Sequence, residues 1–342
     1  MHFQGNRQET AGGEIDLLRK IRALAERRGG GALRLGIGDD CALIGLEAGE
    51  ELAVTTDLSI AGQHFRLDWH PPQSVGYRTL ARGLSDLAAM GARPVAAFLS
   101  LGLPRELTVK QGRKVAWIDG FMDGLFRLAS EHKTPLAGGD LAESPVAVAD
   151  IVLTGAVPAG KALRRSGARA GDILYVTGNL GGAAAGLAKL PRLARDPGSR
   201  RWTSQKAAPA GLAAHLFPQP RVAQGLVLRR RGLASAAIDL SDGLSTDLAH
   251  LCEESGVHAV IGSDALPVAR GATLEQALHG GEDYELLFAA RPSVSMPRSI
   301  GGLAVTRIGY ITPRDRDGAM VCMNTGSGLE PLSRSGWQHF RG

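Results

Sequence analysis

The sequence predicts an α/β (α+β) protein of two domains, and three observations support this prediction. The chain has 342 residues, more than one hydrophobic core normally organises, so two domains of roughly 100–200 residues each are expected. Short apolar segments typical of strands alternate with amphipathic segments typical of helices. Hydrophobic residues make up 44% of the chain and charged residues 21%, which is the balance of an ordinary globular protein.

The first predicted domain covers residues 14–157. Met1 to Gly13 are polar and glycine-rich, which predicts a disordered or expression-derived tail outside the fold. From Glu14 to Arg28 apolar residues recur every three or four positions, so we expect a helix that ends at the glycines after it. The same criteria predict, in order, a strand, a helix, a strand, a helix and a strand over Glu51–Asp57, Ser74–Met90, Pro94–Leu103, Lys110–Ser130 and Val146–Val157.

The second predicted domain covers residues 158–342. Its predicted core elements are a strand, a helix, a strand, a helix and a strand over Asp172–Val176, Gly181–Leu190, Ala236–Leu240, Ser241–Glu254 and Glu285–Ala289. Between the two halves of this domain, Pro191 to Ala210 are rich in Arg, Pro and Ser and show no periodicity. This composition predicts a mobile surface loop.

Charge and composition exclude several classes of protein. The net charge is +5, but the arginines are dispersed and aromatic residues are only 5% of the chain, so no nucleic-acid partner is expected. No apolar run approaches the ~18 residues that a membrane span requires, so no membrane partner is expected. Cys41, Cys252 and Cys322 lie far apart and form no C-x-x-C pair. We therefore expect a cytoplasmic protein without a disulfide framework or a Cys-rich zinc site.

The familiar phosphate-binding loops are absent in a convincing form. Residues 155–162 match G-x-x-x-x-G-K, but Ala162 replaces the Ser or Thr that would hold Mg²⁺. Pro158 also lacks the backbone N–H that such a loop would donate to phosphate. No G-x-G-x-x-G follows a predicted strand, so a Rossmann cofactor site is not indicated either.

Aspartates in six short motifs carry the functional signal instead. In each motif an Asp stands next to Gly, Ser or Thr: residues 38–40, 55–57, 85–86, 138–140, 241–243 and 246–247. One such Asp alone is more often a turn residue or a helix cap. If several converge, their carboxylates repel one another, and Mg²⁺ resolves the conflict because it bridges carboxylates to phosphates. The pattern thus favours Mg²⁺-dependent phosphoryl transfer from ATP.

Seven segments make this hypothesis specific. They are Gly36–Leu43, Thr55–Asp57 with Gly62–Phe65, Leu84–Ala92, Gly138–Asp140, Leu163–Ala168, Ile238–Leu244 and Gly280–Leu286. In this order they resemble the thiamine-monophosphate kinase family, and the runs S-D-L-A-A-M-G-A and G-G-E-D-Y-E-L are the most specific. The ending G-W-Q-H-F is similar to the family's tail, so the resemblance covers nearly everything after residue 13.

The resemblance implies a fold, an assembly and a set of site residues. The fold is the two-domain aminoimidazole-ribonucleotide-synthetase type, with mixed sheets and helices packed on one face. A homodimer is implied, with its interface in the N-terminal domain, and a cleft between the domains binds ATP and several Mg²⁺ ions. By position, the implied metal ligands are Asp40, Thr55, Thr56, Asp57, Asp86, Asp140, Asp242 and Asp247. The implied ATP contacts are Gly139, Asp140, Arg165 and Thr246, and the implied substrate contacts are His64, Glu282 and Trp337.

The implied reaction is direct in-line attack by a phosphate oxygen of thiamine monophosphate on the γ-phosphorus of ATP. Such an acceptor is already anionic near neutral pH, so neither a catalytic base nor a phospho-enzyme is expected. Residue chemistry agrees: Arg165 offers a fork for a phosphate, Glu282 a partner for a cationic or amino-bearing ring, and His64 a flank for an aromatic ring. Each residue also has a non-functional alternative: Arg165 as a solvated surface residue, Glu282 as an ordinary acid at the start of a strand, and His64 as a structural histidine.

Two departures from the family pattern affect the nucleotide side. Leu141 follows Asp140 where relatives commonly carry Thr, and His132 stands where they often carry Tyr. Three other functions are considered: a purine-pathway type of ATP-dependent synthetase, a non-catalytic maturation scaffold and a basic RNA-binding module. The first is opposed by G-G-E-D-Y-E-L, the second by the lack of a terminal Cys, and only net charge favours the third.

Overall fold

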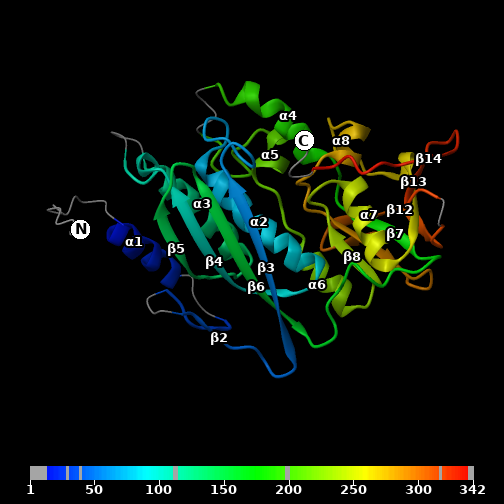
Figure 1. Ribbon diagram of the computed structural model, residues 1–342, viewed down its shortest axis with the longest axis horizontal. Coiled ribbons are helices and arrows are strands. Elements are labelled where there is room, and N and C mark those ends of the chain that lie inside the picture. Colours follow the sequence, from blue (N-terminus) through cyan, green and yellow to red (C-terminus); the bar gives the residue numbers. More distant parts are fainter. Residues whose placement is uncertain are drawn as a thin grey trace, which may run out of the picture.

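The computed structural model describes residues 14–27, 31–37, 41–110, 115–196, 201–315 and 318–337. The predicted tail and the predicted ligand Asp40 lie outside these residues. Figure 1 shows the N-terminal elements on the left and the C-terminal elements on the right, each group built on its own sheet. The predicted α/β architecture with mixed sheets is confirmed.

The N-terminal part is built on a four-stranded sheet. Its strand order is β3 (Glu50–Ile60), β6 (Val148–Pro158), β4 (Arg93–Leu103), β5 (Leu136–Glu143). β4 and β5 are parallel, so α3 (Trp117–Glu131) connects them, while the other pairs are antiparallel. Helices α2 (Pro72–Ala89) and α3 cover one face (Figure 1). On the other face, α1 (Glu14–Glu26) and the small sheet β1 (Leu33–Leu35)–β2 (Leu43–Ile44) pack beside β4 and β5.

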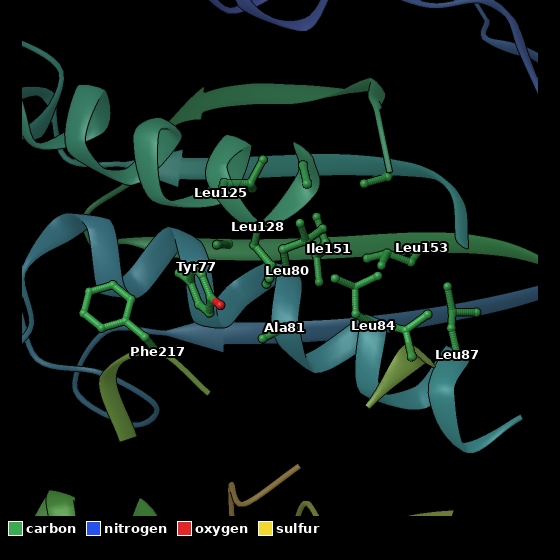
Figure 2. Close-up of a cluster of buried hydrophobic side chains, with 14 of the residues drawn as sticks. Tyr77, Leu80, Ala81, Leu84, Leu87, Leu125, Leu128, Ile151, Leu153 and Phe217 are labelled. Carbon is green, nitrogen blue, oxygen red and sulfur yellow. The ribbon is translucent and has the colours of Figure 1, made fainter. Parts of the chain in front are cut away.

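Helix α2 has an apolar face and a polar face. Leu80, Leu84 and Leu87 are fully buried in one core with Ile151 and Leu153 of β6, as Figure 2 shows. Burying a leucine side chain stabilises a fold by roughly 1.5–3 kcal/mol, so this face fixes α2 on the sheet. The polar residues of α2 recur at positions 78, 82, 85 and 86, about one helical turn apart. They therefore point together toward one side, where the candidate site lies.

Glycines let α2 and α3 approach closely. A Cβ atom on Gly76 would lie 1.9 Å from the backbone oxygen of Phe121, and one on Gly124 would lie 1.9 Å from that of Gln73. Backbone atoms cannot move aside as the end of a side chain can. The two helices are thus as close as glycine allows.

We expect Gly76→Ala to destabilise the protein by about 1–3 kcal/mol or more, because the added methyl group forces α2 and α3 apart. The measurement is the melting temperature by differential scanning calorimetry. The matched control is Gly211→Ala in α5 (Ala210–Leu216), whose Cβ would have only the end of the Lys189 side chain within 4 Å, at 3.6 Å. Equal melting temperatures for Gly76→Ala and the wild type would contradict this account.

The C-terminal part is built on a larger sheet. Its order is β14 (Leu329–Pro331), β13 (Val321–Asn324), β9 (His258–Gly262), β12 (Leu303–Thr312), β7 (Ile173–Thr177), β10 (Leu286–Ala290), β8 (Ala236–Asp239), and β11 (Ser299–Ile300) pairs with β12. Only the β13–β9 pair among these is parallel. The helices are α4 (Gly182–Leu193), α5, α6 (Val222–Arg230), α7 (Leu244–Ser255) and α8 (Leu274–His279), with a short 3₁₀ turn at Ser263–Ala265. A second 3₁₀ turn, Arg105–Leu107, follows β4 in the N-terminal part.

Successive residues of β10 pack into two different hydrophobic cores, and this joins the two parts of the chain. Leu287 and Ala289 belong to the core that contains Leu248 of α7, whereas Leu286 and Phe288 belong to the core of α2. α2 also packs against α6 and β8. The C-terminal end of β8 and the loop before β10 therefore both lie beside the polar face of α2.

Three predicted elements differ from the structure. The prediction of a helix from Lys110 is wrong at its start: α3 begins at Trp117, where the buried apolar face begins, and Val115 is 68% exposed. α7 begins at Leu244 rather than Ser241, because Gly243 has φ 114°, outside the helical region. α4 continues to Leu193, and Trp202 is buried, so the predicted loop 191–210 is structured in part.

Candidate active site

A cavity of about 970 Å³ lies between the two parts of the chain. It is lined by residues of the loop after β3, of α2, of α4 and α5, of the segment after β8, of the loop before β10 and of the C-terminal segment. Six predicted site residues line it: Asp57, His64, Asp86, Asp242, Glu282 and Trp337. Residues that are up to 280 positions apart, from 57 to 337, thus share one cavity.

The polar face of α2 organises this cavity. Arg82 pairs with Asp57 of β3 at 2.7 Å, and Ser85 Oγ donates to Asp239 Oδ2 at 2.7 Å. One position further, Asp86 accepts a hydrogen bond from Thr55 Oγ1. A single helix therefore links the end of β3 to the end of β8, and both carboxylates of the pair Asp86 and Asp239 are held in place.

Burial raises the pKa values of three carboxyl groups at the acidic end of the cavity, and neighbouring carboxylates add to the rise. Burial, together with the charges of Asp239 and Asp57, raises the pKa of Asp86 to about 7. Burial raises the pKa of Asp239 to about 6, against the lowering effect of Ser85 and Arg165. Burial also raises the pKa of Asp57, although Arg82 opposes the shift. A cation bound here would remove this conflict.

The donor set fits Mg²⁺ shared with a ligand better than Mg²⁺ held by protein alone. Within the described ranges, no three carboxylate, imidazole or thiolate groups lie close enough to enclose one ion. The groups present are carboxylates and the Thr55 hydroxyl, which are hard oxygen donors. Mg²⁺ typically takes one or two carboxylates and completes its shell with phosphate oxygens and water. The arrangement therefore fits a metal–phosphate complex.

Thr56 lies apart from this group. Successive side chains of a strand point to opposite faces, so Thr55 and Asp57 face α2 while Thr56 faces the other side of the sheet. There its hydroxyl donates to Asp150 Oδ1 at 3.1 Å. The structure does not bring Thr56 together with Asp86, and its role as a ligand stays a prediction.

Gly139 and Asp140 line a second, smaller cavity of about 450 Å³ between α1 and β5. Asp140 Oδ1 accepts the backbone N–H of Leu141 at 2.8 Å. Gly139 has φ 147°, and a Cβ atom there would lie 1.9 Å from the Leu99 oxygen, so only glycine fits. The nucleotide contacts predicted here stay predictions, and Leu141 and Cys41 line the same cavity.

Two predicted site residues near the start of α7, Thr246 and Asp247, accept hydrogen bonds from backbone N–H groups of the protein. Asp247 Oδ2 accepts the backbone N–H groups of Asp242 and Gly243 at 3.1 and 3.0 Å. Thr246 Oγ1 accepts the N–H of Gly336 at 3.2 Å. Both side chains are buried, so they hold the loop before α7 and the C-terminal segment in place. Arg165 is exposed, and its charge opposes the rise in the pKa values of Asp86 and Asp239.

The run G-G-E-D-Y-E-L forms a strained loop before β10. Glu282 and Tyr284 have φ values of 68° and 50°, rare for residues with side chains. Their backbone N–H groups donate to Ser241 and Leu240 at 2.8 and 2.9 Å, which keeps the loop in this conformation. The loop thereby aims Glu282 into the cavity.

Asp283 of this loop has a different role. Its two oxygens accept the N–H groups of Gly181 and Ala183 at 2.6 and 3.1 Å, at the start of α4. Burial raises its pKa to about 7. Asp283 therefore joins the loop to the start of α4.

The other end of the cavity is aromatic and less acidic. Phe65, Trp69 and Trp337 line it with His64 and Glu282. Ile60 N–H donates to His64 Nδ1 at 3.1 Å, so this ring is fixed to the end of β3. An apolar, aromatic end with one carboxylate is suited to an organic ring that carries a cation or an N–H donor.

Sequence reasoning missed several residues that line the cavity or reach it: Arg78, Arg82, His70, His215 and Asp239. One signal was present, because the polar residues of α2 are spaced four apart on an otherwise buried helix. No local signal identified the two histidines.

Two family models together match most of the chain. The model for "AIR synthase related protein, N-terminal domain" matches residues 38–160, and that for the C-terminal domain matches residues 169–322. A thiamine-monophosphate kinase of Salmonella typhimurium is 44% identical over 262 residues, which are 74% of this chain and 75% of that protein. The thiamine-monophosphate kinase of Escherichia coli (strain K12) is 40% identical over 320 residues, covering 90% of this chain and 92% of its own.

Solved structures extend the similarity. The thiamine-monophosphate kinase from Stenotrophomonas maltophilia superposes with a TM-score of 0.73 at 36% identity, covering 91% of this chain and 96% of that one. AaThiL complexed with AMPPCP and TMP gives a TM-score of 0.71 at 29% identity, covering 99% and 100%. The hydrogenase maturation protein HypE, at 18% identity and a TM-score of 0.70, shares the fold alone. In the described part of this chain, no helix is long and apolar enough to cross a membrane.

Proposed function

Since the chain belongs to the thiamine-monophosphate kinase family, its activity is the ATP-dependent phosphorylation of thiamine monophosphate to thiamine diphosphate, and we propose how its site performs that reaction. One observation carries the proposal: a single cavity of about 970 Å³ is lined both by carboxylates, Asp57, Asp86, Asp239 and Asp242, and by the aromatic side chains of Phe65, Trp69 and Trp337. The acidic end takes the phosphates, and the aromatic end takes the thiamine rings.

The phosphates bind at the acidic end with Mg²⁺. Thr55, Asp57, Asp86 and Asp242 would hold the ions there, in agreement with the raised pKa values of Asp57 and Asp86. Bound Mg²⁺ supplies charge neutralisation for the transferring phosphoryl group.

The chain itself contributes positioning. Arg82 holds Asp57, and Ser85 holds Asp239, so the acidic groups keep fixed places before substrates bind. A phosphate oxygen of thiamine monophosphate attacks the γ-phosphorus in line, and ADP leaves on the opposite side. No side chain needs to remove a proton, since the acceptor phosphate is largely dianionic above pH 6.

The thiamine rings lie between His64, Trp337 and Glu282 in this proposal. Glu282 accepts a hydrogen bond from an amino group or faces the positive ring, and the aromatic side chains contact the ring faces. The Asp140 cavity, the exposed Arg165 and the segment around Thr246 bind the nucleotide side. Free cysteines at positions 41, 252 and 322 and the use of ATP support action in the cytoplasm.

The function is tested by a mass-resolved product assay with ATP, Mg²⁺ and either thiamine or thiamine monophosphate. Thiamine diphosphate formed from the monophosphate, with one ADP for each product, is the expected result. Omitting Mg²⁺ and adding a chelator is expected to stop the reaction. Absence of ADP and product with the monophosphate would overturn the assignment, and product formed equally fast without any divalent ion would overturn the metal part alone.

We also propose that two copies of the chain associate through the part of the N-terminal sheet, at β3, that α1 and the β1–β2 sheet leave exposed. Leu52, Val54 and Leu58 alternate along β3 and are 48%, 60% and 45% exposed. Exposure of these apolar side chains to water is unfavourable. Packing this face against the same face of a second copy buries them and gives a closed, two-fold assembly.

Val54→Asp is expected to convert the dimer into a monomer, because it would bury a carboxylate in an apolar contact. The measurement is molar mass by light scattering during size-exclusion chromatography, at several protein concentrations. Leu329→Asp on β14, 59% exposed in the wild type, is the control and should leave the mass unchanged. An unchanged mass for Val54→Asp, or a monomeric wild type, would refute this interface.

A further inference from the structure

Arg82 of α2 is a positively charged side chain that lines the active-site cavity. Its Nη2 pairs with Asp57 Oδ1 at 2.7 Å, and its Nη1 donates to Ser59 Oγ at 3.4 Å. The side chain is 17% exposed, and no other hydrogen bond or ion pair reaches its guanidinium from the described residues. An arginine has five N–H donors, so most of them remain available to a ligand in the cavity.

Arg82 lies between two groups with different proposed roles. Residues 78, 82 and 86 are four positions apart on α2, so they follow one another along one face of the helix, ~6 Å apart. Arg78 forms an ion pair with Glu282, the proposed contact to the thiamine rings. Asp86, one turn beyond Arg82, is a proposed metal ligand. The position of Arg82 is therefore between the part of α2 that serves the rings and the part that serves the metal.

Arg66 is the other arginine among the residues that line the cavity, and its donors are engaged. Its Nε and Nη2 donate to the two carboxylate oxygens of Asp68 at 3.0 and 3.1 Å. Its guanidinium also lies over the ring of Trp69, 4.5 Å from the ring centre. A carboxylate thus already occupies the fork of Arg66, whereas Arg82 meets its carboxylate through one nitrogen only.

The phosphate group of the acceptor substrate needs a cation at the position of Arg82. In the proposed function the rings of thiamine monophosphate lie at Glu282, and an oxygen of its phosphate group attacks ATP beside the metal ions. The phosphate group then lies between these two places, near the carboxylate of Asp57, which repels it. A guanidinium that pairs with Asp57 through one N–H group and donates to the phosphate through others offsets this repulsion.

We propose that Arg82 binds the phosphate group of thiamine monophosphate, as a bridge between that group and Asp57, and so selects thiamine monophosphate over thiamine. The inference rests on the proposed placement of the rings and the metal ions in this cavity. Both molecules have the same rings, so contacts at Glu282 do not distinguish them. Thiamine has a hydroxyl group in place of the phosphate and leaves Arg82 without an anionic ligand. Arg82 is in this way a residue that determines substrate specificity.

Arg82→Met keeps most of the aliphatic stem and removes the donors. We expect the dissociation constant of thiamine monophosphate to rise about thirtyfold and that of thiamine to change less than about threefold, because only the first loses charge-assisted hydrogen bonds. The measurement is isothermal titration calorimetry with Mg²⁺ and the ATP analogue AMPPCP present. Arg66→Met is the matched control and should leave the ratio of the two constants unchanged. A ratio that Arg82→Met also leaves unchanged would overturn the proposal.

A second variant separates a direct contact from a change in the electrostatic field. Arg82→Lys keeps a positive charge beside Asp57 but replaces the planar fork by one ammonium group, which is a poor bridge between two anions. A direct contact predicts binding of thiamine monophosphate about tenfold weaker than in the wild type. Wild-type binding by Arg82→Lys would show that Arg82 acts through its field alone and would overturn the proposal. This variant retains a cation for Asp57, so it decides the question even if Arg82→Met does not fold.

The product assay on the wild type keeps this inference distinct from the proposed function. A wild type that forms no thiamine diphosphate from thiamine monophosphate would refute the proposed function. A wild type that forms it, together with Arg82 variants that bind thiamine monophosphate as tightly as the wild type does, would refute only the role of Arg82. The expected result is product from the wild type and a lower kcat/KM for thiamine monophosphate in both Arg82 variants.

Discussion

Asp86→Asn is expected to lower kcat by about a thousandfold or more while the protein keeps its melting temperature. Charge stabilisation by a metal is worth several kcal/mol, and each 1.4 kcal/mol is tenfold in rate, so loss of one ligand has an effect of this size. The melting temperature is expected to stay the same because the ionised Asp86 carboxylate does not stabilise the fold: burial and the charges of Asp239 and Asp57 raise the pKa of Asp86 to about 7. A neutral amide of the same shape removes that repulsion.

The same substitution at Asp242, which lines the acidic end from the C-terminal part, should have a similar effect. Steady-state kinetics over a range of Mg²⁺ concentrations and thermal unfolding with and without Mg²⁺ form the measurement. Mg²⁺ with an ATP analogue should raise the melting temperature of the wild type more than that of either variant. Asp264→Asn, in an exposed 3₁₀ turn, is the matched control. Near-normal turnover in both variants would show that the metal assignment is wrong.

The sequence predicted elements best where periodicity was strong. The helix over Ser74–Met90 matches α2 within two residues, because an apolar stripe and a following glycine define it. β5 was missed, since Leu136–Glu143 has only a short apolar start and continues through Gly138, Gly139 and Asp140. Its strand conformation comes from parallel pairing with β4, which is a contact between distant parts of the chain.

The site was predicted in composition more than in arrangement. Motifs identified the acidic residues, and strand alternation alone could have separated Thr56 from Thr55 and Asp57. Arg78 and Arg82 could not be assigned from local pattern, because their partners Glu282 and Asp57 lie on other elements. A charged residue on a buried helix indicates some partner, but only the fold identifies which one.

The two glutamates of G-G-E-D-Y-E-L illustrate the same limit, because only the first faces the cavity. Glu285 is 3% exposed and directly precedes β10, and Thr177 Oγ1 and Arg221 Nε donate to its Oε2 at 2.6 and 2.7 Å. Arg221 also pairs with Oε1, which makes the contact bidentate. A Cβ atom on Gly178 would lie 2.0 Å from Glu285 Oε1, so the chain closes tightly round this carboxylate.

Arg221→Met is therefore expected to destabilise the protein by about 3–5 kcal/mol at pH 7.5, since it leaves a buried carboxylate without its cation. Burial raises the pKa of Glu285 even in the wild type, and Arg221 is the largest opposing influence. Without Arg221 the pKa rises further. A raised carboxyl pKa means that the folded state binds a proton more tightly than the unfolded state, so stability is lost as pH rises through that pKa.

The loss caused by Arg221→Met should thus be largest at pH 7.5 and smaller at pH 5, where Glu285 can accept a proton. The measurement is the difference in melting temperature between the variant and the wild type at each pH in this range. Other titrating groups affect both proteins equally and cancel in this difference. Arg22→Met, which breaks an exposed pair with Glu26, is the control and should change stability by at most about 1 kcal/mol at either pH. A pH-independent loss for Arg221→Met would mean that packing of the arginine stem, rather than the charge on Glu285, accounts for the effect.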